Sequence, residues 1–134
     1  MAIVDVVASQ SKCKRQKVGA LVVKGSNIIA IGYNGTPSGF DNNCECEDGS
    51  THPYVLHAES NAIAKCAKST IGTSGAILYC TLSPCLECAK LIIQSDISEV
   101  YYKQQYRDSS PIELLSLANI KCEKYEGSTF NDKR

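Results

Sequence analysis

The sequence Ala76-Ile-Leu-Tyr-Cys-Thr-Leu82 runs directly into Ser83-Pro-Cys-Leu-Glu-Cys88. The first stretch is continuously apolar, which is typical of a β-strand buried on both faces. In the second stretch, a serine followed by a proline indicates the start of a helix, with Ser83 as the N-cap and Pro84 at the first helical position. We therefore expect a strand that passes into a helix with almost no connection between them.

The segments on both sides of this unit predict an alternating α/β chain. Upstream, the apolar runs 18–23 and 28–33 are separated by a short turn that contains glycine, which predicts a β-hairpin. The other expected elements are a helix over 1–10, a helix from residue 57, a strand over 100–102, a helix over 111–118 and a strand over 120–125. We expect residues 126–134 to be frayed. This order predicts an α/β fold, a three-layer α/β/α sandwich with a mixed sheet of about five strands.

Length and composition limit the class of protein. A chain of 134 residues is expected to form a single domain over residues 1–134. Its 14 basic and 14 acidic residues give zero net charge, which argues against a polynucleotide partner held by bulk electrostatics. No apolar run approaches ~18 residues and the first residues do not resemble a signal peptide, so we expect no membrane span and a cytoplasmic location. There the eight cysteines should be reduced, and clusters of reduced cysteines indicate metal binding more than disulfides.

Two short motifs supply a candidate metal centre. Cys85 and Cys88 are one helical turn apart at the start of their helix, so both thiolates face the same way, and the helix N-terminus favours their negative charge. His57 is a third candidate ligand, and His, Cys and Cys around Zn²⁺ leave a fourth tetrahedral position open for water. If His57 lies at the very start of its own helix, Glu59 becomes a base beside that water and not a ligand.

Each motif alone has other meanings, because Cys-x-x-Cys also occurs in redox pairs, structural zinc sites and iron–sulfur sites. His-x-Glu followed by Pro-Cys-x-x-Cys is the signature of zinc-dependent nucleobase deaminases. A redox protein that uses Cys85 and Cys88 would leave His57 and Glu59 without a role. A zinc-stabilised binding module without catalysis would not need a free carboxylate beside an open coordination position.

On these residues, the chain resembles the cytidine deaminase superfamily. Three further stretches resemble the deoxycytidylate (dCMP) deaminases, and they are Val18-Gly-Ala20, Gly32-Tyr-Asn-Gly-Thr-Pro-Ser-Gly39, and Tyr106-Arg-Asp followed by Ile112-Glu-Leu-Leu115. The resemblance implies a cytidine deaminase-like fold and hydrolytic deamination of dCMP to dUMP and ammonia, supplying dUMP for dTMP synthesis. A zinc-activated water would attack, with Glu59 as the proton shuttle. Alternatives are another cytosine nucleotide or nucleoside, guanine, or adenosine in tRNA; the neutral charge disfavours tRNA.

The resemblance also implies partners and regulation. Members of this family are commonly homohexamers, activated by dCTP together with Mg²⁺ and inhibited by dTTP. The glycine-rich loop that contains Asn34 and Gly35 is near the effector site in that family, so these two residues are expected to contact the effector.

Four residues are candidates for binding the substrate. The resemblance implies that the Asn34 amide holds the sugar or the base, although Asn-Gly is also an ordinary turn pair. Ser83 either only caps its helix or also presents its backbone to the edge of the base. Tyr106 and Arg107 place a ring and a guanidinium near the phosphate, which suits the fork of donors of arginine, or they lie in solvent. A basic run beside Cys13 is either an exposed loop or a phosphate contact, and it comprises Lys12, Lys14, Arg15 and Lys17.

A second, structural zinc is also expected. Cys44, Cys46 and His52 fall within one polar loop, and Cys13 precedes the first strand of the hairpin. Three cysteines and one histidine form a closed zinc set, which would tie down a loop that has little core of its own. The resemblance supports this site, because some dCMP deaminases hold a structural zinc with matching regions. The alternative is that these are spare thiols with His52 in solvent.

Overall fold

The structure, a computed structural model, describes residues 2–125, so the expected fraying of residues 126–134 lies outside the described residues. Its helices are α1 (Ala2–Ala8), α2 (Ala58–Ala67), α3 (Leu86–Gln94) and α4 (Ser110–Leu117). Its strands are β1 (Gly19–Lys24), β2 (Asn27–Tyr33), β3 (Ile77–Leu82), β4 (Glu99–Gln104) and β5 (Lys121–Lys124). The predicted hairpin and the alternating order that follows it are therefore confirmed.

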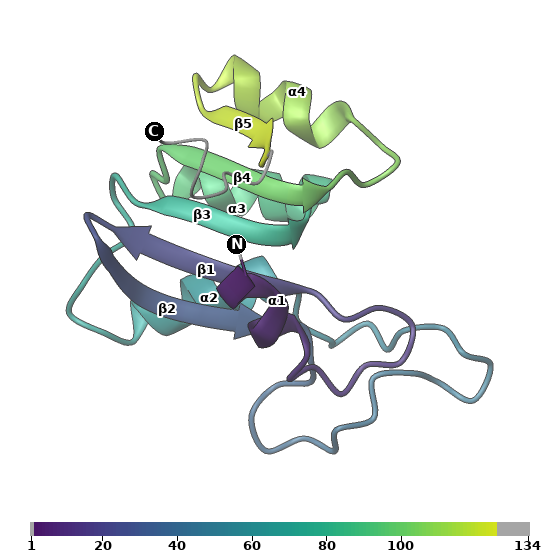
Figure 1. Cartoon of the computed structure of the whole chain (residues 1–134). Coiled ribbons are helices and arrows are strands. Elements are labelled where there is room, and N and C mark those ends of the chain that lie inside the picture. Colours follow the sequence, from purple (N-terminus) through teal and green to yellow (C-terminus); the bar gives the residue numbers. More distant parts are fainter. Residues whose placement is uncertain (1, 126–134) are drawn as a thin grey trace.

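The five strands form one mixed sheet in the order β2-β1-β3-β4-β5. β1 pairs antiparallel with β2 and with β3, whereas β3, β4 and β5 are parallel to one another. The parallel pairs require crossovers, and α3 and α4 supply them. Helix α1 covers one face of the sheet, and α2 and α3 cover the other (Figure 1). The predicted three-layer sandwich with a mixed sheet is thus confirmed.

The main core lies between the sheet and helices α2, α3 and α4. Alternate strand residues face this layer because side chains alternate along a strand. They are Ala20 and Val22 in β1, Leu78 and Cys80 in β3, and Val100 and Tyr102 in β4. The opposite face has a much smaller cluster around Val4, Val7 and Leu21 under α1.

The prediction that β3 is buried on both faces is wrong. Leu78 and Cys80 are buried toward the main core, but Tyr79 on the other face is only half-buried. The reason is that α1 has seven residues and covers only part of its face. The apolar run in β3 therefore marks a central strand with one dry face and one partly open face.

A glycine lets α2 approach the sheet closely. A Cβ at Gly32 in β2 would contact the carbonyl oxygen of Ala58 and lie 2.6 Å from the backbone nitrogen of Ala62. Only a residue without a side chain fits there, so the first turn of α2 is held against the end of β2. This close contact fixes where α2 begins.

Two irregular connections, 9–18 and 34–57, lie together at one end of the sheet (Figure 1). A disulfide joins Cys13 in the first to Cys44 in the second. The Glu45 carboxylate accepts hydrogen bonds from the backbone N–H groups of Lys14 (2.9 Å) and Arg15 (3.2 Å).

Of the helices within residues 2–125, none has the length and apolar character needed to span a bilayer.

Candidate active site

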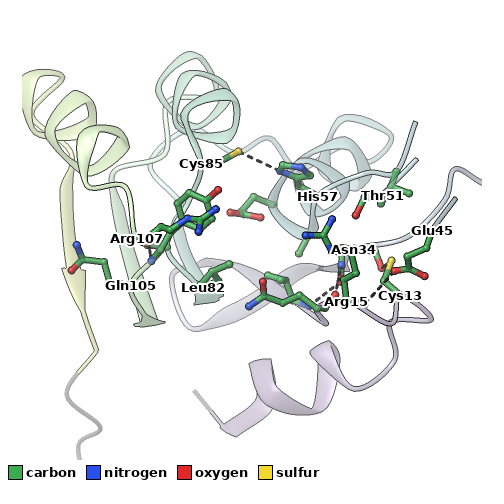
Figure 2. A pocket seen from close by; sticks show the side chains of 17 residues that line it. Cys13, Arg15, Asn34, Glu45, Thr51, His57, Leu82, Cys85, Gln105 and Arg107 are labelled. Carbon is green, nitrogen blue, oxygen red and sulfur yellow. Dashed lines mark hydrogen bonds between the residues drawn. The ribbon is translucent and has the colours of Figure 1, made fainter. Parts of the chain in front are cut away.

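Three of the predicted metal ligands meet where α2 and α3 begin. His57 is the N-cap residue of α2 and Cys85 is the N-cap residue of α3, both with extended backbone, and Cys88 follows in the first turn of α3. The Nδ1 atom of His57 lies 3.3 Å from the Sγ atom of each cysteine. Figure 2 shows the contact between His57 and Cys85 across the top of the pocket. His57 thus occupies the helix-start position that the sequence required of it.

The arrangement of these three side chains fits a zinc ion. Tetrahedral bonds of about 2.0 Å to nitrogen and about 2.3 Å to sulfur imply nitrogen–sulfur separations of roughly 3.5 Å. The observed separations are close to this value, and all three ligand atoms lie within 4.8 Å of one another. Within the described residues, this group contains no fourth histidine, cysteine or carboxylate. Three ligands of this kind leave a coordination position for water, as in catalytic zinc sites.

The two sulfurs differ in their ionisation. Hydrogen bonds from the Cys88 thiol and from His57 lower the pKa of Cys85 to about 3. The same bond to Cys85, together with burial, raises the pKa of Cys88. The bond with Cys85 also raises the pKa of His57. A negative sulfur is therefore favoured at the N-terminus of α3, which is the charge state that a metal cation needs.

Glu59 lies beside the three ligands without joining them. It follows the N-cap of α2 by two residues and its residue is only 4% exposed. Burial raises the pKa of the Glu59 carboxyl to about 7, although the charge of His57 acts to lower it. The prediction for Glu59 is a carboxylate beside the metal that is not itself a ligand. In the structure Glu59 lines the same cavity as His57 and Cys85 and is not part of the group of three candidate ligands.

These groups form one wall of a cavity of about 540 Å³. Residues from the irregular connections 9–18 and 34–57 line one side, and residues 105–107, which follow β4, line another. Arg15 and Arg107 approach from opposite sides (Figure 2). The lining comprises Cys13, Arg15, Gln16, Val18, Asn34, Glu45, Thr51, Val55, His57, Ala58, Glu59, Leu82, Ser83, Cys85, Gln105, Tyr106 and Arg107. The volume is in the range usual for sites that take a small organic ligand.

Asn34 lies in this cavity, but its amide is already hydrogen-bonded to the backbone. Its Oδ1 atom accepts from the N–H of Val18 (2.8 Å), and its Nδ2 atom donates to the carbonyl of Gln16 (2.7 Å). The amide therefore fixes the segment next to Arg15, and one N–H of Asn34 is left for a ligand. Neighbouring Gly35 exchanges two backbone hydrogen bonds with Leu56.

Gly35 lines a second, smaller cavity of about 230 Å³. Lys12, Tyr33, Thr36 and Asn42 complete its lining. Of the predicted basic run, Lys12 lies at this smaller cavity and Arg15 at the larger one. Lys14 and Lys17 line neither of these two cavities.

Ser83 is not the helix N-cap that the Ser-Pro pair predicted. Helix α3 begins at Leu86 with Cys85 as its N-cap, and no side chain caps it. Ser83 still belongs to the sheet, because its N–H donates to the carbonyl of Gln104 (2.9 Å). Its hydroxyl oxygen accepts from the N–H of Tyr106 (2.6 Å) and makes no capping bond to the helix. Ser83, Tyr106 and Arg107, which the sequence predicts as substrate contacts, all line the large cavity.

The four predicted ligands of a structural zinc form two pairs. Cys13 and Cys44 are joined by a disulfide, where the sequence predicted reduced thiols. Their sulfurs and a carboxylate oxygen of Glu45 lie within 4.8 Å of one another. The Sγ atom of Cys46 lies 3.2 Å from Nδ1 of His52. A disulfide sulfur is not a thiolate, so Cys13 and Cys44 are not zinc ligands in this form.

Sequence reasoning did not identify several polar residues of the large cavity, namely Gln16, Glu45, Thr51 and Gln105. All of them lie in irregular segments, where no periodicity indicates which side chains turn inward. The signal that was available is proximity in sequence: Gln105 precedes Tyr106, and Glu45 lies between Cys44 and Cys46.

Comparisons with known proteins agree with this geometry. The protein-family model of the cytidine and deoxycytidylate deaminase zinc-binding region matches residues 1–104. Deoxycytidylate deaminase from Saccharomyces cerevisiae is 37% identical over 135 residues, which cover 93% of this chain and 43% of that protein. The human deoxycytidylate deaminase is 37% identical over 138 residues, covering 93% of this chain and 76% of that protein. The chain thus spans less than half the length of the yeast relative.

A solved structure is also closely similar. It is the dCMP deaminase from the cyanophage S-TIM5 in complex with dCMP and dUMP. It superposes with a TM-score of 0.90 and is 49% identical, and the alignment covers 92% of both chains. The sheet order and the helix starts that carry His57, Cys85 and Cys88 thus occur in a fold that also holds these two nucleotides.

Proposed function

Because the chain belongs to the cytidine and deoxycytidylate deaminase family, we propose that it hydrolyses dCMP to dUMP and ammonia. One observation carries the proposal: the His57, Cys85 and Cys88 ligand atoms meet beside a buried carboxyl, Glu59, at one wall of a cavity. The cyanophage relative, which is similar over 92% of both chains, binds dCMP and dUMP. An alternative substrate is another cytosine nucleotide or nucleoside.

The residues of this chain divide the chemistry among them. His57, Cys85 and Cys88 would hold zinc, which supplies a polarised water that loses a proton near neutral pH. Glu59 accepts a proton from the attacking water and delivers it to N3 of the cytosine ring. It then accepts the second proton, from the hydroxyl formed at C4, and gives it to the amine as the C4–N bond breaks. Water contributes the oxygen at C4 and ammonia departs, so the atoms balance. The burial of Glu59 keeps bulk water from competing for its proton.

The remaining lining residues orient the nucleotide. Arg107 and Arg15 are the guanidinium groups of the cavity, and they suit a phosphate because each offers several N–H donors in a fixed fork. The free N–H of Asn34 is available to a sugar or base oxygen. Ser83 and Tyr106 border the position of the base next to the metal-binding helix.

Regulation and assembly follow from the family resemblance and stay predictions. A homohexamer, activation by dCTP with Mg²⁺ and inhibition by dTTP are expected, with Gly35 and Asn34 as effector contacts. The small cavity between Lys12, Gly35 and Asn42 supports an effector position because it offers a basic group beside polar side chains. The cytoplasmic location also stays a prediction. A free monomer at micromolar concentration that is insensitive to dTTP contradicts the assembly and the regulation.

One assay tests the proposed reaction. The purified protein is incubated separately with dCMP, CMP, deoxycytidine and dCTP, each with and without dTTP, and loss of the 4-amino group is followed by ultraviolet absorbance. We expect turnover of dCMP above the others. Substitution Glu59→Gln should retain zinc and abolish turnover, with a fall on the order of 10²–10⁴-fold. Near wild-type rates in that variant, or no deamination of any cytosine compound by the wild type, contradict the proposal.

A further inference from the structure

We propose that the hydroxyl of Ser83 is a positioning group that holds residues 105–107 against the start of the metal-binding helix. The inference rests on the proposed function, since it assigns Ser83 a part in binding the nucleotide. It differs from a helix cap and from a direct contact with substrate, because Ser83 acts through the backbone of Tyr106.

The parallel strands β3 and β4 separate shortly before α3 begins. The regular pairing of β3 with β4 ends at Leu82 and Gln104. One more backbone bond follows, from the N–H of Ser83 to the carbonyl of Gln104 (2.9 Å). Beyond this bond, the segment that follows β3 leads into α3 through Pro84. Because Pro84 carries no N–H, the ladder of backbone hydrogen bonds cannot continue.

The Ser83 side chain replaces the missing backbone partner. Its Oγ atom accepts from the N–H of Tyr106 at 2.6 Å, two residues beyond the end of the ladder. Ser83 is only 3% exposed, so this bond is largely shielded from competing water. Within residues 2–125, no other hydrogen bond joins residues 105–107 to a different element. Ser83 is therefore what ties this wall of the cavity to the scaffold.

The bond between Ser83 and Tyr106 connects the part of the proposed site that would hold the metal with the part formed by residues 105–107. Ser83 lies two residues before Cys85, and Tyr106 lies directly between Gln105 and Arg107, which all line the cavity. If the bond is lost, Arg107 is no longer held in its binding position, while the ligands His57, Cys85 and Cys88 remain supported by their own helices. The expected defect is in nucleotide binding and not in the chemical step.

The test is steady-state kinetics on the zinc-loaded full chain with dCMP. Substitution Ser83→Ala should raise KM about tenfold, the equivalent of one buried hydrogen bond, and leave kcat within about twofold. The matched control is Ser69→Ala, because Ser69 Oγ also accepts a backbone N–H, that of Ile71 (3.1 Å), but lies outside the cavity. This control should not change KM.

A double-mutant cycle separates positioning from general structural support. Arg107→Ala should raise KM by itself, and adding Ser83→Ala to it should raise KM little further, because both changes remove the same interaction. Three results overturn the inference. They are additive effects of the two substitutions on KM, an unchanged KM in Ser83→Ala, and a Ser83→Ala variant that loses thermal stability and kcat while its KM stays the same. A wild type that does not deaminate dCMP contradicts the proposed function itself, and the inference falls with it.

A second pair of variants removes the donor and covers the case in which Ser83→Ala does not fold. Tyr106→Ala keeps the backbone N–H, and Tyr106→Pro removes it. We expect Tyr106→Pro to have a KM several-fold above that of Tyr106→Ala. Removing the N–H donor at position 106 breaks the same hydrogen bond as removing the Ser83 hydroxyl, and the two losses should cost about the same. Equal KM values for the two variants overturn the inference.

Discussion

The molecule contains two sulfur-rich clusters that are built in different ways. In the first, His57 and Cys85 are the N-cap residues of α2 and α3, and Cys88 follows one turn later. In the second, Cys13, Cys44 and Glu45 come from irregular segments, and a disulfide joins the two sulfurs. The first cluster is positioned by helices that pack on the sheet, whereas the second is held mainly by its own bonds.

The two clusters obtain their stability from different sources. The helices of the first cluster belong to the main core through residues such as Ala62 and Ala89, so the ligand geometry does not depend on a metal. The loop of the second cluster has few core contacts, and a covalent bond or a metal ion is needed to fix it. We expect the loss of a metal to remove activity at the first site and stability at the second.

The largest effect should come from substituting a ligand of the first cluster. Cys88→Ser should lose zinc and lower kcat on the order of 10³-fold or more, because the activation of water is lost. Cys46→Ser, in the loop that carries the second cluster, should lower kcat by at most about tenfold, since Cys46 lies outside the proposed chemistry. Metal analysis and the absorbance assay measure both, with Cys122→Ala in β5 as a control thiol. Equal losses in the two variants would erase the distinction between the clusters.

The next effect concerns the bond between Cys13 and Cys44. Their separation of 31 residues implies that opening the disulfide without metal lowers the free energy of unfolding by about 4 kcal/mol. If zinc replaces the bond, metal analysis should give about one zinc per chain for the oxidised protein and about two after reduction in the presence of zinc. The Cys13→Ser/Cys44→Ser variant should be insensitive to reductant. A ratio of one in both redox states eliminates the structural zinc.

A smaller effect should follow from a change in the support of the first cluster. Gly32→Ala would press a methyl group against the backbone of Ala58 and Ala62 and should cost about 3 kcal/mol of stability. It should also lower activity, since His57 and Glu59 lie at the same end of α2. Gly72→Ala is the matched control, because nothing lies within 4 Å of its added carbon. Chemical denaturation measures both, and similar stabilities would show that α2 can move away from the sheet without penalty.

The smallest effect is expected at Asn34. Asn34→Ala removes two hydrogen bonds to the segment 16–18 and should lower the free energy of unfolding by about 1–2 kcal/mol and raise KM. Asn43→Ala in the loop of the second cluster removes only an exposed bond to Glu45 N–H, so it should change stability by less than about 0.5 kcal/mol. Thermal denaturation compares them. If Asn43→Ala is the more damaging variant, the loop is better supported than we infer.

Much of the fold could be predicted because its signals are local. The hairpin, the strand over 77–82 and the helix at Pro111 follow from apolar runs and turn residues in the sequence. Ser83 is instructive because a correct local rule gave a wrong position. The serine stays in the sheet, and its oxygen is taken by Tyr106, a partner 23 residues away. Propensity rules do not contain such distant partners.

Part of the candidate site could also be predicted from local motifs. His57, Glu59, Cys85 and Cys88 form two compact motifs, so their meeting could be anticipated from the helix starts. The disulfide could not be, because the approach of Cys13 to Cys44 depends on how two irregular segments cross. The same holds for Gln105 and Glu45, whose orientation is set by loop conformation.

The origin of the cavity walls has a consequence for redesign. The proposed reacting groups lie at the starts of helices that pack on the sheet, while much of the remaining cavity wall comes from connections 9–18, 34–57 and 105–107. Such segments can be exchanged between relatives as modules without disturbing the reacting groups. Grafting the connection after β4 from a deaminase of different preference is therefore the shortest route to a chain with new substrate selectivity, provided that the transplanted segment keeps an N–H for Ser83.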